Sequence, residues 1–151
     1  MIKVCIADNY PVVHFGVKSY FKDNAEISLV ANVGNFLMVR DILQTKEIDV
    51  LILDLELEGL ASIFEVKALL KNFPKTKIII FSGLSEQIYA PNAIKAGVSG
   101  FVHKSETLET LGQSISKVHQ GKIIMNETVK KNLALIAKQS KSERLYRKLS
   151  N

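Results

Sequence analysis

Five short apolar runs, each of strand length, recur along the chain and are separated by stretches with helical spacing. They cover residues 2–7, 27–33, 48–53, 77–81 and 100–102. The third and fourth consist almost wholly of Leu, Ile and Val, which is typical of strands buried on both faces. Strands that alternate with helices form βαβ units, whose right-handed crossovers build a parallel sheet. The pattern predicts an α/β fold with a doubly wound, five-stranded parallel sheet sandwiched by helices.

The intervening stretches carry apolar stripes at helical spacing, such as Val13, Val17 and Phe21. A fifth helix is expected over residues 106–119, closed by Gly121 in the left-handed conformation. Pro91 predicts that the fourth helix is short and starts near that residue, because proline is tolerated in a first turn but not inside a helix. Asn126 can cap a last helix with Val129, Leu133 and Ile136 on one face.

The positive charge of the chain lies almost wholly in its last segment. The net charge is +5 over 151 residues. Residues 126–151 hold seven basic and two acidic side chains, while residues 1–125 hold 13 of each. A basic-domain argument for nucleic acid therefore does not apply to the first 125 residues, and the tail is expected to be a solvated linker rather than a direct nucleic-acid contact.

Polar side chains that could form a site stand at the carboxyl ends of four predicted strands. In a doubly wound sheet, ligands bind beyond these ends. The first strand is followed by Asp8 and Asn9, the third by Asp54, the fourth by Ser82 and the fifth, shortly afterwards, by Lys104. The set suits acyl-phosphate chemistry, with one Asp as nucleophile, an oxygen-rich pocket for Mg²⁺, and Ser and Lys on the phosphoryl oxygens.

The same residues, in order, make the chain resemble a response-regulator receiver domain with the flavodoxin-like fold, of the NarL/FixJ kind that precedes a LuxR-type output domain. The resemblance covers residues 1 to about 122. Spacings of 46, 28 and 22 residues separate Asp8, Asp54, Ser82 and Lys104. The resemblance implies that Asp54, in DVLILDLEL, is the phosphoacceptor. It also implies that Ser82, Lys104 and the aromatic Phe101 bind the phosphoryl group or change conformation when it is present.

The resemblance also implies a cofactor and partners. Mg²⁺ would be held by Asp8, Asn9, Asp54 and the backbone carbonyl of Glu56. A histidine kinase would supply the phosphoryl group in the cytoplasm, and the domain would be a phosphorylated switch rather than a turnover enzyme. The chain departs from the family at three positions: Asn9 replaces the second acidic residue, Glu58 stands where the family usually has Pro, and Pro91 falls where the fourth helix is normally mid-run. Mg²⁺ is expected to bind weakly, because an amide brings no charge.

The resemblance divides the chain into a receiver, residues 1–122, and a basic helical linker, residues 123–151. We expect a transcription factor shortened before its helix-turn-helix domain, so that DNA is contacted only through that absent domain. The stripe on the last helix is apolar enough to need a partner surface, either its own receiver or a second copy in a homodimer. No run reaches the ~18 apolar residues of a membrane span, and the strand-like start argues against a secretory signal.

Other interpretations account for some of these residues. Asp54 with Lys104 could be a structural ion pair, Asp8-Asn9 a turn, Ser82 a loop hydroxyl and Phe101 a core aromatic. Cys5 is expected to be an inert buried thiol, and the three histidines are too scattered for a metal site and are expected on the surface. An aspartyl phosphatase would need a DxD motif after the first strand, and a nucleotide binder would need a glycine-rich loop there. The sequence has neither at this position, so both functions are set aside. The alternative that stays open is a pseudo-receiver, an interaction or dimerisation module that works without phosphorylation.

Overall fold

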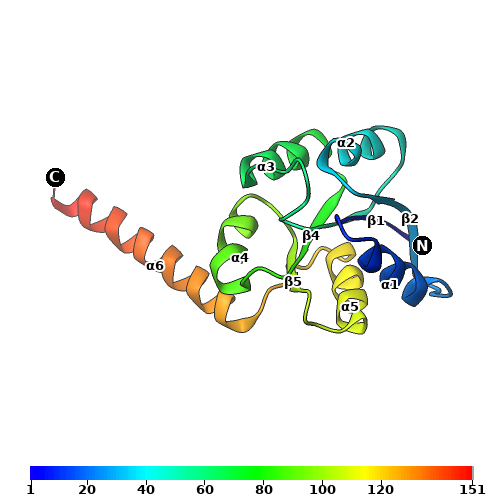
Figure 1. Ribbon diagram of the computed structural model, residues 1–151. Coiled ribbons are helices and arrows are strands. Elements are labelled where there is room, and N and C mark those ends of the chain that lie inside the picture. Colours follow the sequence, from blue (N-terminus) through cyan, green and yellow to red (C-terminus); the bar gives the residue numbers. More distant parts are fainter. Residues whose placement is uncertain (151) are drawn as a thin grey trace.

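A single parallel sheet in the order β2-β1-β3-β4-β5 forms the centre of the computed structural model, which describes residues 1–150 (Figure 1). The strands are β1 (Ile2–Ala7), β2 (Ile27–Val33), β3 (Val50–Leu53), β4 (Lys77–Ser82) and β5 (Gly100–His103). The helices are α1 (Pro11–Phe21), α2 (Phe36–Thr45), α3 (Ile63–Asn72), α4 (Glu86–Lys95), α5 (Leu108–His119) and α6 (Glu127–Ser150). The predicted α/β class and the doubly wound, helix-covered sheet are confirmed.

Each central strand is buried on both faces, and successive side chains alternate between two cores. In β3, Leu51 and Leu53 belong to the core under α2, α3 and α4, whereas Val50 and Ile52 belong to the core under α1 and α5. All four side chains are at most 1 % exposed. This two-sided burial explains why the strand sequences are continuous apolar runs rather than alternating ones.

Helix α4 differs from its prediction, because it begins five residues before Pro91 and carries that proline inside. Ser85 caps its first turn by accepting the N–H of Ile88 at 3.4 Å. Ala90 and Ala93, on either side of the proline, are completely buried. Pro91 lacks the N–H that would bond the carbonyl of the residue four positions earlier. The packing of the alanine face and the cap outweigh that loss, so the expected short helix starting near Pro91 is wrong.

The segment after α5 is bound to the domain rather than free. Gly121 has a φ of +96°, the left-handed conformation predicted for it. Ile124 then pairs with the edge of the sheet: its carbonyl accepts the N–H of Phe101 at 2.9 Å and its N–H donates to Ser99 at 2.8 Å. A Cβ on Gly100 would lie 3.3 Å from Ile124, which suits glycine at this position. The strand edge of β5 is thereby covered by the chain's own continuation.

Helix α6 begins at the predicted cap, with the Asn126 side chain accepting the N–H of Val129 at 2.8 Å. Val129 is fully buried in the core that includes α4, and Leu133 packs against that core. Further along, Leu145 and Leu149 are 60 % and 80 % exposed, and the helix extends away from the domain (Figure 1). The start of α6 therefore docks on its own receiver; Asn151, the last residue of the expected linker, lies outside the described residues.

Replacing Val129 by aspartate is expected to undock α6, because a charge would have to enter a completely buried position. An undocked helix of this composition is marginal in water, so most of its helix content should be lost. Far-UV circular dichroism measures this loss. Leu135→Asp, at a position 59 % exposed on the same helix, is the matched control and should leave the spectrum unchanged. Equal helix content in both variants would contradict the docking.

Candidate functional site

Three charged side chains from three strand ends meet at the carboxyl edge of the sheet. Asp8 follows β1 and Asp54 follows β3, and the Asp54 N–H donates to the carbonyl of Ala7 at 3.0 Å. The Lys104 Nζ atom, just after β5, lies 2.7 Å from Asp8 Oδ2 and 2.9 Å from Asp54 Oδ2. Parallel strands bring their carboxyl ends to one edge, so residues up to 96 positions apart become neighbours.

The carboxylates of this group are deeply buried, with Asp8 1 % and Asp54 2 % exposed. Their second oxygens are also bonded: Asp8 Oδ1 accepts the N–H of Tyr10 at 2.9 Å, and Asp54 Oδ1 accepts the N–H of Glu56 at 3.0 Å. Burial by itself would lower the pKa of Lys104. The hydrogen bonds and attraction from Asp8 and Asp54 outweigh it and raise that pKa above its usual value. Lys104 is therefore a stable cation shared by two buried anions.

Asn9 is the side chain next to this group, and its amide bonds the loop between β3 and α3. Asn9 Nδ2 donates to the carbonyl of Glu56 at 2.8 Å, and Asn9 Oδ1 accepts the N–H of Glu58 at 2.8 Å. The four residues expected to hold Mg²⁺ thus lie together. The hydrogen bonds between Asn9 and this loop were not expected from the sequence. Glu58 in place of proline was a signal for one of them, because only a non-proline residue has the N–H that Asn9 accepts.

The arrangement of these oxygens does not fit the octahedral Mg²⁺ centre that the resemblance implies. Such a centre needs the oxygens of Asn9 and Glu56 to point at one ion. Here the Asn9 nitrogen, not its oxygen, faces the Glu56 carbonyl, and the Asn9 oxygen faces the Glu58 N–H. Within residues 1–150 no group of three or more His, Cys, Asp or Glu side chains is placed to hold a metal.

The two remaining predicted site residues are buried. Ser82 is completely buried, and its Oγ accepts the N–H of Leu84 at 3.1 Å. Phe101 is 2 % exposed and belongs to the core that also contains Ala90 and Val129. The role of each in binding or switching stays a prediction.

Cys5 and the histidines lie outside this group. Cys5 is completely buried, and burial raises its pKa to about 12, as expected for an inert thiol. His119 is exposed as predicted, but His14 and His103 are only partly exposed. His14 Nε2 lies 2.6 Å from the carbonyl of Asp8, and His103 Nε2 lies 3.0 Å from that of Gly83. Both rings therefore brace loops at the carboxyl edge of the sheet.

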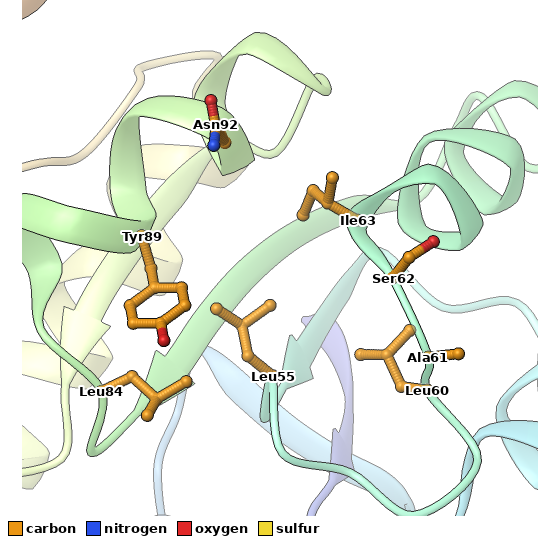
Figure 2. Close-up of a pocket in the computed structure, with 8 residues that line it drawn as sticks. All are labelled: Leu55, Leu60, Ala61, Ser62, Ile63, Leu84, Tyr89 and Asn92. Atoms are coloured by element: carbon orange, nitrogen blue, oxygen red, sulfur yellow. The ribbon is translucent and has the colours of Figure 1, made fainter.

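A shallow pocket of about 280 Å³ lies between α3 and α4, beside the turn that follows Ser82. Figure 2 shows its lining: Leu55, Leu60, Ala61, Ser62, Ile63, Leu84, Tyr89 and Asn92. No charged side chain contributes. Leu84 connects the pocket to the site, because its N–H bonds Ser82.

The family described as "Response regulator receiver domain" matches residues 4–116. The chain is 30 % identical over 118 residues to the Fimbriae Z protein of Salmonella typhimurium, covering 78 % of this chain and 56 % of that protein. It thus spans little more than half the length of this relative. No helix among residues 1–150 is long and apolar enough to cross a membrane.

Solved structures share the fold. A two-component response regulator of the LuxR family from Aurantimonas sp. SI85-9A1 superposes with a TM-score of 0.78 at 22 % identity, over 89 % of this chain and 96 % of that one. RcsB from Salmonella enterica serovar Typhimurium, solved on the promoter rprA with the phosphomimetic BeF3⁻, gives 0.77 at 23 %, over 97 % and 77 % of the two chains. RcsB has also been solved as dimers bound to DNA.

The family match, the order of the sheet and the relatives agree. Receiver domains are signalling modules rather than turnover enzymes, they generally bind Mg²⁺, and they pair with histidine kinases. This chain belongs to the response regulator receiver domain family, and its relatives are LuxR-type regulators of the NarL/FixJ kind.

Proposed function

We propose that this receiver accepts a phosphoryl group from a histidine kinase on Asp54. One observation carries the proposal: Asp54 directly follows a central strand, and its carboxylate shares the Lys104 ammonium with Asp8. A carboxylate oxygen of Asp54 attacks phosphorus, a P–O bond forms, and the P–N bond to the donor histidine breaks with its electron pair passing to the ring nitrogen. Asp8 keeps Lys104 in place while Asp54 reacts.

The phosphoryl group would change the contacts of three residues. Lys104 binds one of its oxygens in place of the carboxylate oxygen, which keeps the ion pair but moves its position. Ser82 turns its hydroxyl from the Leu84 N–H to a phosphoryl oxygen, which shifts the turn before α4. Phe101, next to α4 in the core, follows that shift as the aromatic switch residue.

We place the output beyond the receiver, which we take as residues 1–122. Residues 123–151 form the linker, and its contacts through Ile124 and Val129 tie it to β5 and α4. DNA is contacted through an output domain outside these 151 residues. The start of α6 docks on its own receiver, so the buried Val129 is not available for a homodimer contact. Phosphotransfer from a kinase implies a cytoplasmic protein.

The alternative is a pseudo-receiver that acts as an interaction or dimerisation module without phosphorylation. The hydrogen bonds of Asn9 favour it, because they order the site in the place where the resemblance implies a metal. The same labelling experiment distinguishes the two functions.

Incubation with acetyl phosphate is expected to add one phosphate, read as intact mass, in a labile acyl linkage on Asp54. Asp54→Asn should abolish the labelling, because the amide is not a nucleophile. Asp23→Asn is the matched control: it makes the same chemical change at an exposed position after α1, so labelling should persist. Labelling that survives Asp54→Asn would overturn the assignment, and no labelling with or without Mg²⁺ would favour the pseudo-receiver.

A further inference from the structure

The Asn9 amide makes two hydrogen bonds whose partners leave only one possible orientation. The Glu56 carbonyl can only accept a hydrogen bond, and the Glu58 N–H can only donate one. Asn9 meets them with Nδ2 and Oδ1 respectively, each at 2.8 Å. A reversed amide would set oxygen against oxygen and N–H against N–H. We call this paired contact of Asn9 with Glu56 and Glu58 the Asn9 clasp.

The clasp is one of several attachments that fix residues 56–58. The Glu56 N–H donates to Asp54 Oδ1 at 3.0 Å. The carbonyl of Glu58 accepts the N–H of Phe36, the first residue of α2, at 2.8 Å. Leu57, between them, is 2 % exposed. The loop is therefore held from the β1 side, from Asp54 and from α2 at once.

Two of the three departures from the family pattern, Asn9 and Glu58, are the residues that the clasp requires. The side chain of an aspartate at position 9 has no N–H to donate to the Glu56 carbonyl, and its negative charge would face that carbonyl oxygen. A proline at position 58 has no N–H to give to Asn9. Asn9 and Glu58 thus complement each other, although 49 residues separate them. Asn9 is neutral and adds no further charge next to the Asp8 and Asp54 carboxylates that Lys104 contacts.

We propose that the Asn9 clasp takes the place of a divalent cation in holding the 56–58 loop, so that this receiver keeps its site ordered without metal. A metal at this position would need the oxygens of Asn9 and Glu56, and both are engaged in the clasp. Mg²⁺ binding must then open two hydrogen bonds, which makes it weak. The inference concerns the same site as the proposed phosphoacceptor, but it does not depend on phosphorylation of Asp54.

Thermal unfolding of the metal-free protein, with and without millimolar MgCl₂, tests the clasp. The melting temperature of the wild type is expected to stay unchanged on adding Mg²⁺. Asn9→Asp should lower it by about 5 °C without metal, because one hydrogen bond is lost and two oxygens are forced together. Mg²⁺ should restore that loss, and its affinity should rise at least about fivefold over wild type, because a carboxylate attracts the ion.

Asn24→Asp is the matched control, because it makes the same chemical change at the other end of the sheet. Asn24 uses only its Oδ1 atom, which accepts the N–H groups of Glu26 and Ile27 at 2.8 Å each, and an aspartate keeps both bonds. It should show no dependence on Mg²⁺. A wild type stabilised by Mg²⁺ as much as Asn9→Asp, or an Asn9→Asp variant of unchanged metal-free stability, would overturn the proposal.

Amide hydrogen exchange of the wild type gives a second measurement that needs no variant. The Glu58 N–H should be protected in EDTA-treated protein, and Mg²⁺ should not increase its protection. Fast exchange of Glu58 without metal would show that the clasp does not hold. Loss of labelling at Asp54 would leave both measurements intact, so failure of the proposed function and failure of the clasp are distinguishable.

Discussion

Replacing Lys104 by methionine is expected to lower the free energy of unfolding by about 3 kcal/mol at neutral pH, the usual cost of breaking a buried ion pair from one side. Methionine keeps much of the length and volume of the side chain but leaves Asp8 and Asp54 without their cation. Both carboxylates are at most 2 % exposed. Urea unfolding followed by circular dichroism measures the loss.

The pH dependence of this stabilisation follows from the raised pKa of Lys104. Between the unfolded pKa of about 10.4 and the higher folded one, the folded state binds more protons, so stability falls as pH rises there. The difference in free energy of unfolding between wild type and Lys104→Met should therefore be largest at neutral pH and decrease only in strongly alkaline solution.

Lys3→Met is the matched control for Lys104→Met. Lys3 pairs with Glu47 at 3.2 Å, but the two side chains are 47 % and 78 % exposed. A solvent-exposed pair contributes at most about 1 kcal/mol. Adding Asp8→Asn to Lys104→Met should recover part of the lost stability, because one unpaired buried charge is removed. A Lys104→Met protein as stable as wild type at neutral pH would contradict the shared ion pair.

Replacing Phe101 by alanine is expected to lower the free energy of unfolding by about 3 kcal/mol or more, because it removes a buried ring and leaves a cavity. Phe101 is 2 % exposed and lies in the core beneath α4 and the start of α6. Urea unfolding measures the change. Phe64→Ala, at a position 76 % exposed, should cost less than about 0.5 kcal/mol.

The two Phe101 roles, core packing and switching, separate in a milder variant. Phe101→Leu keeps most of the apolar volume and should cost about 1 kcal/mol. If Phe101 only packs, acetyl phosphate should change the hydrogen exchange of α4 equally in Phe101→Leu and wild type. If it also switches, that change should be smaller in Phe101→Leu. A Phe101→Ala protein of wild-type stability would contradict the packing seen in the structure.

The fold and the residues that form the charged group could be predicted from the sequence, because both depend on short local patterns. Runs such as VLIL before Asp54 define buried strands by composition alone, and a parallel sheet must bring the ends of its strands to one edge. Asp8, Asp54 and Lys104 therefore meet wherever the strands pair in this order. Gly121 and Asn126 likewise act within one turn of their own position.

The tertiary structure decided the features that depend on contacts between residues distant in the sequence. Pro91 lies inside α4 because buried alanines on both sides of it stabilise the helix. Ile124 covers the edge of β5, and Val129 docks α6, through contacts that the linker's composition does not specify. The Asn9 amide engages Glu58 across 49 residues. The sequence determined which side chains stand at the strand ends. Folding determined their long-range contacts, from Lys104 to the two aspartates and from Asn9 to the 56–58 loop, because only the assembled sheet and loops bring those atoms within 3 Å.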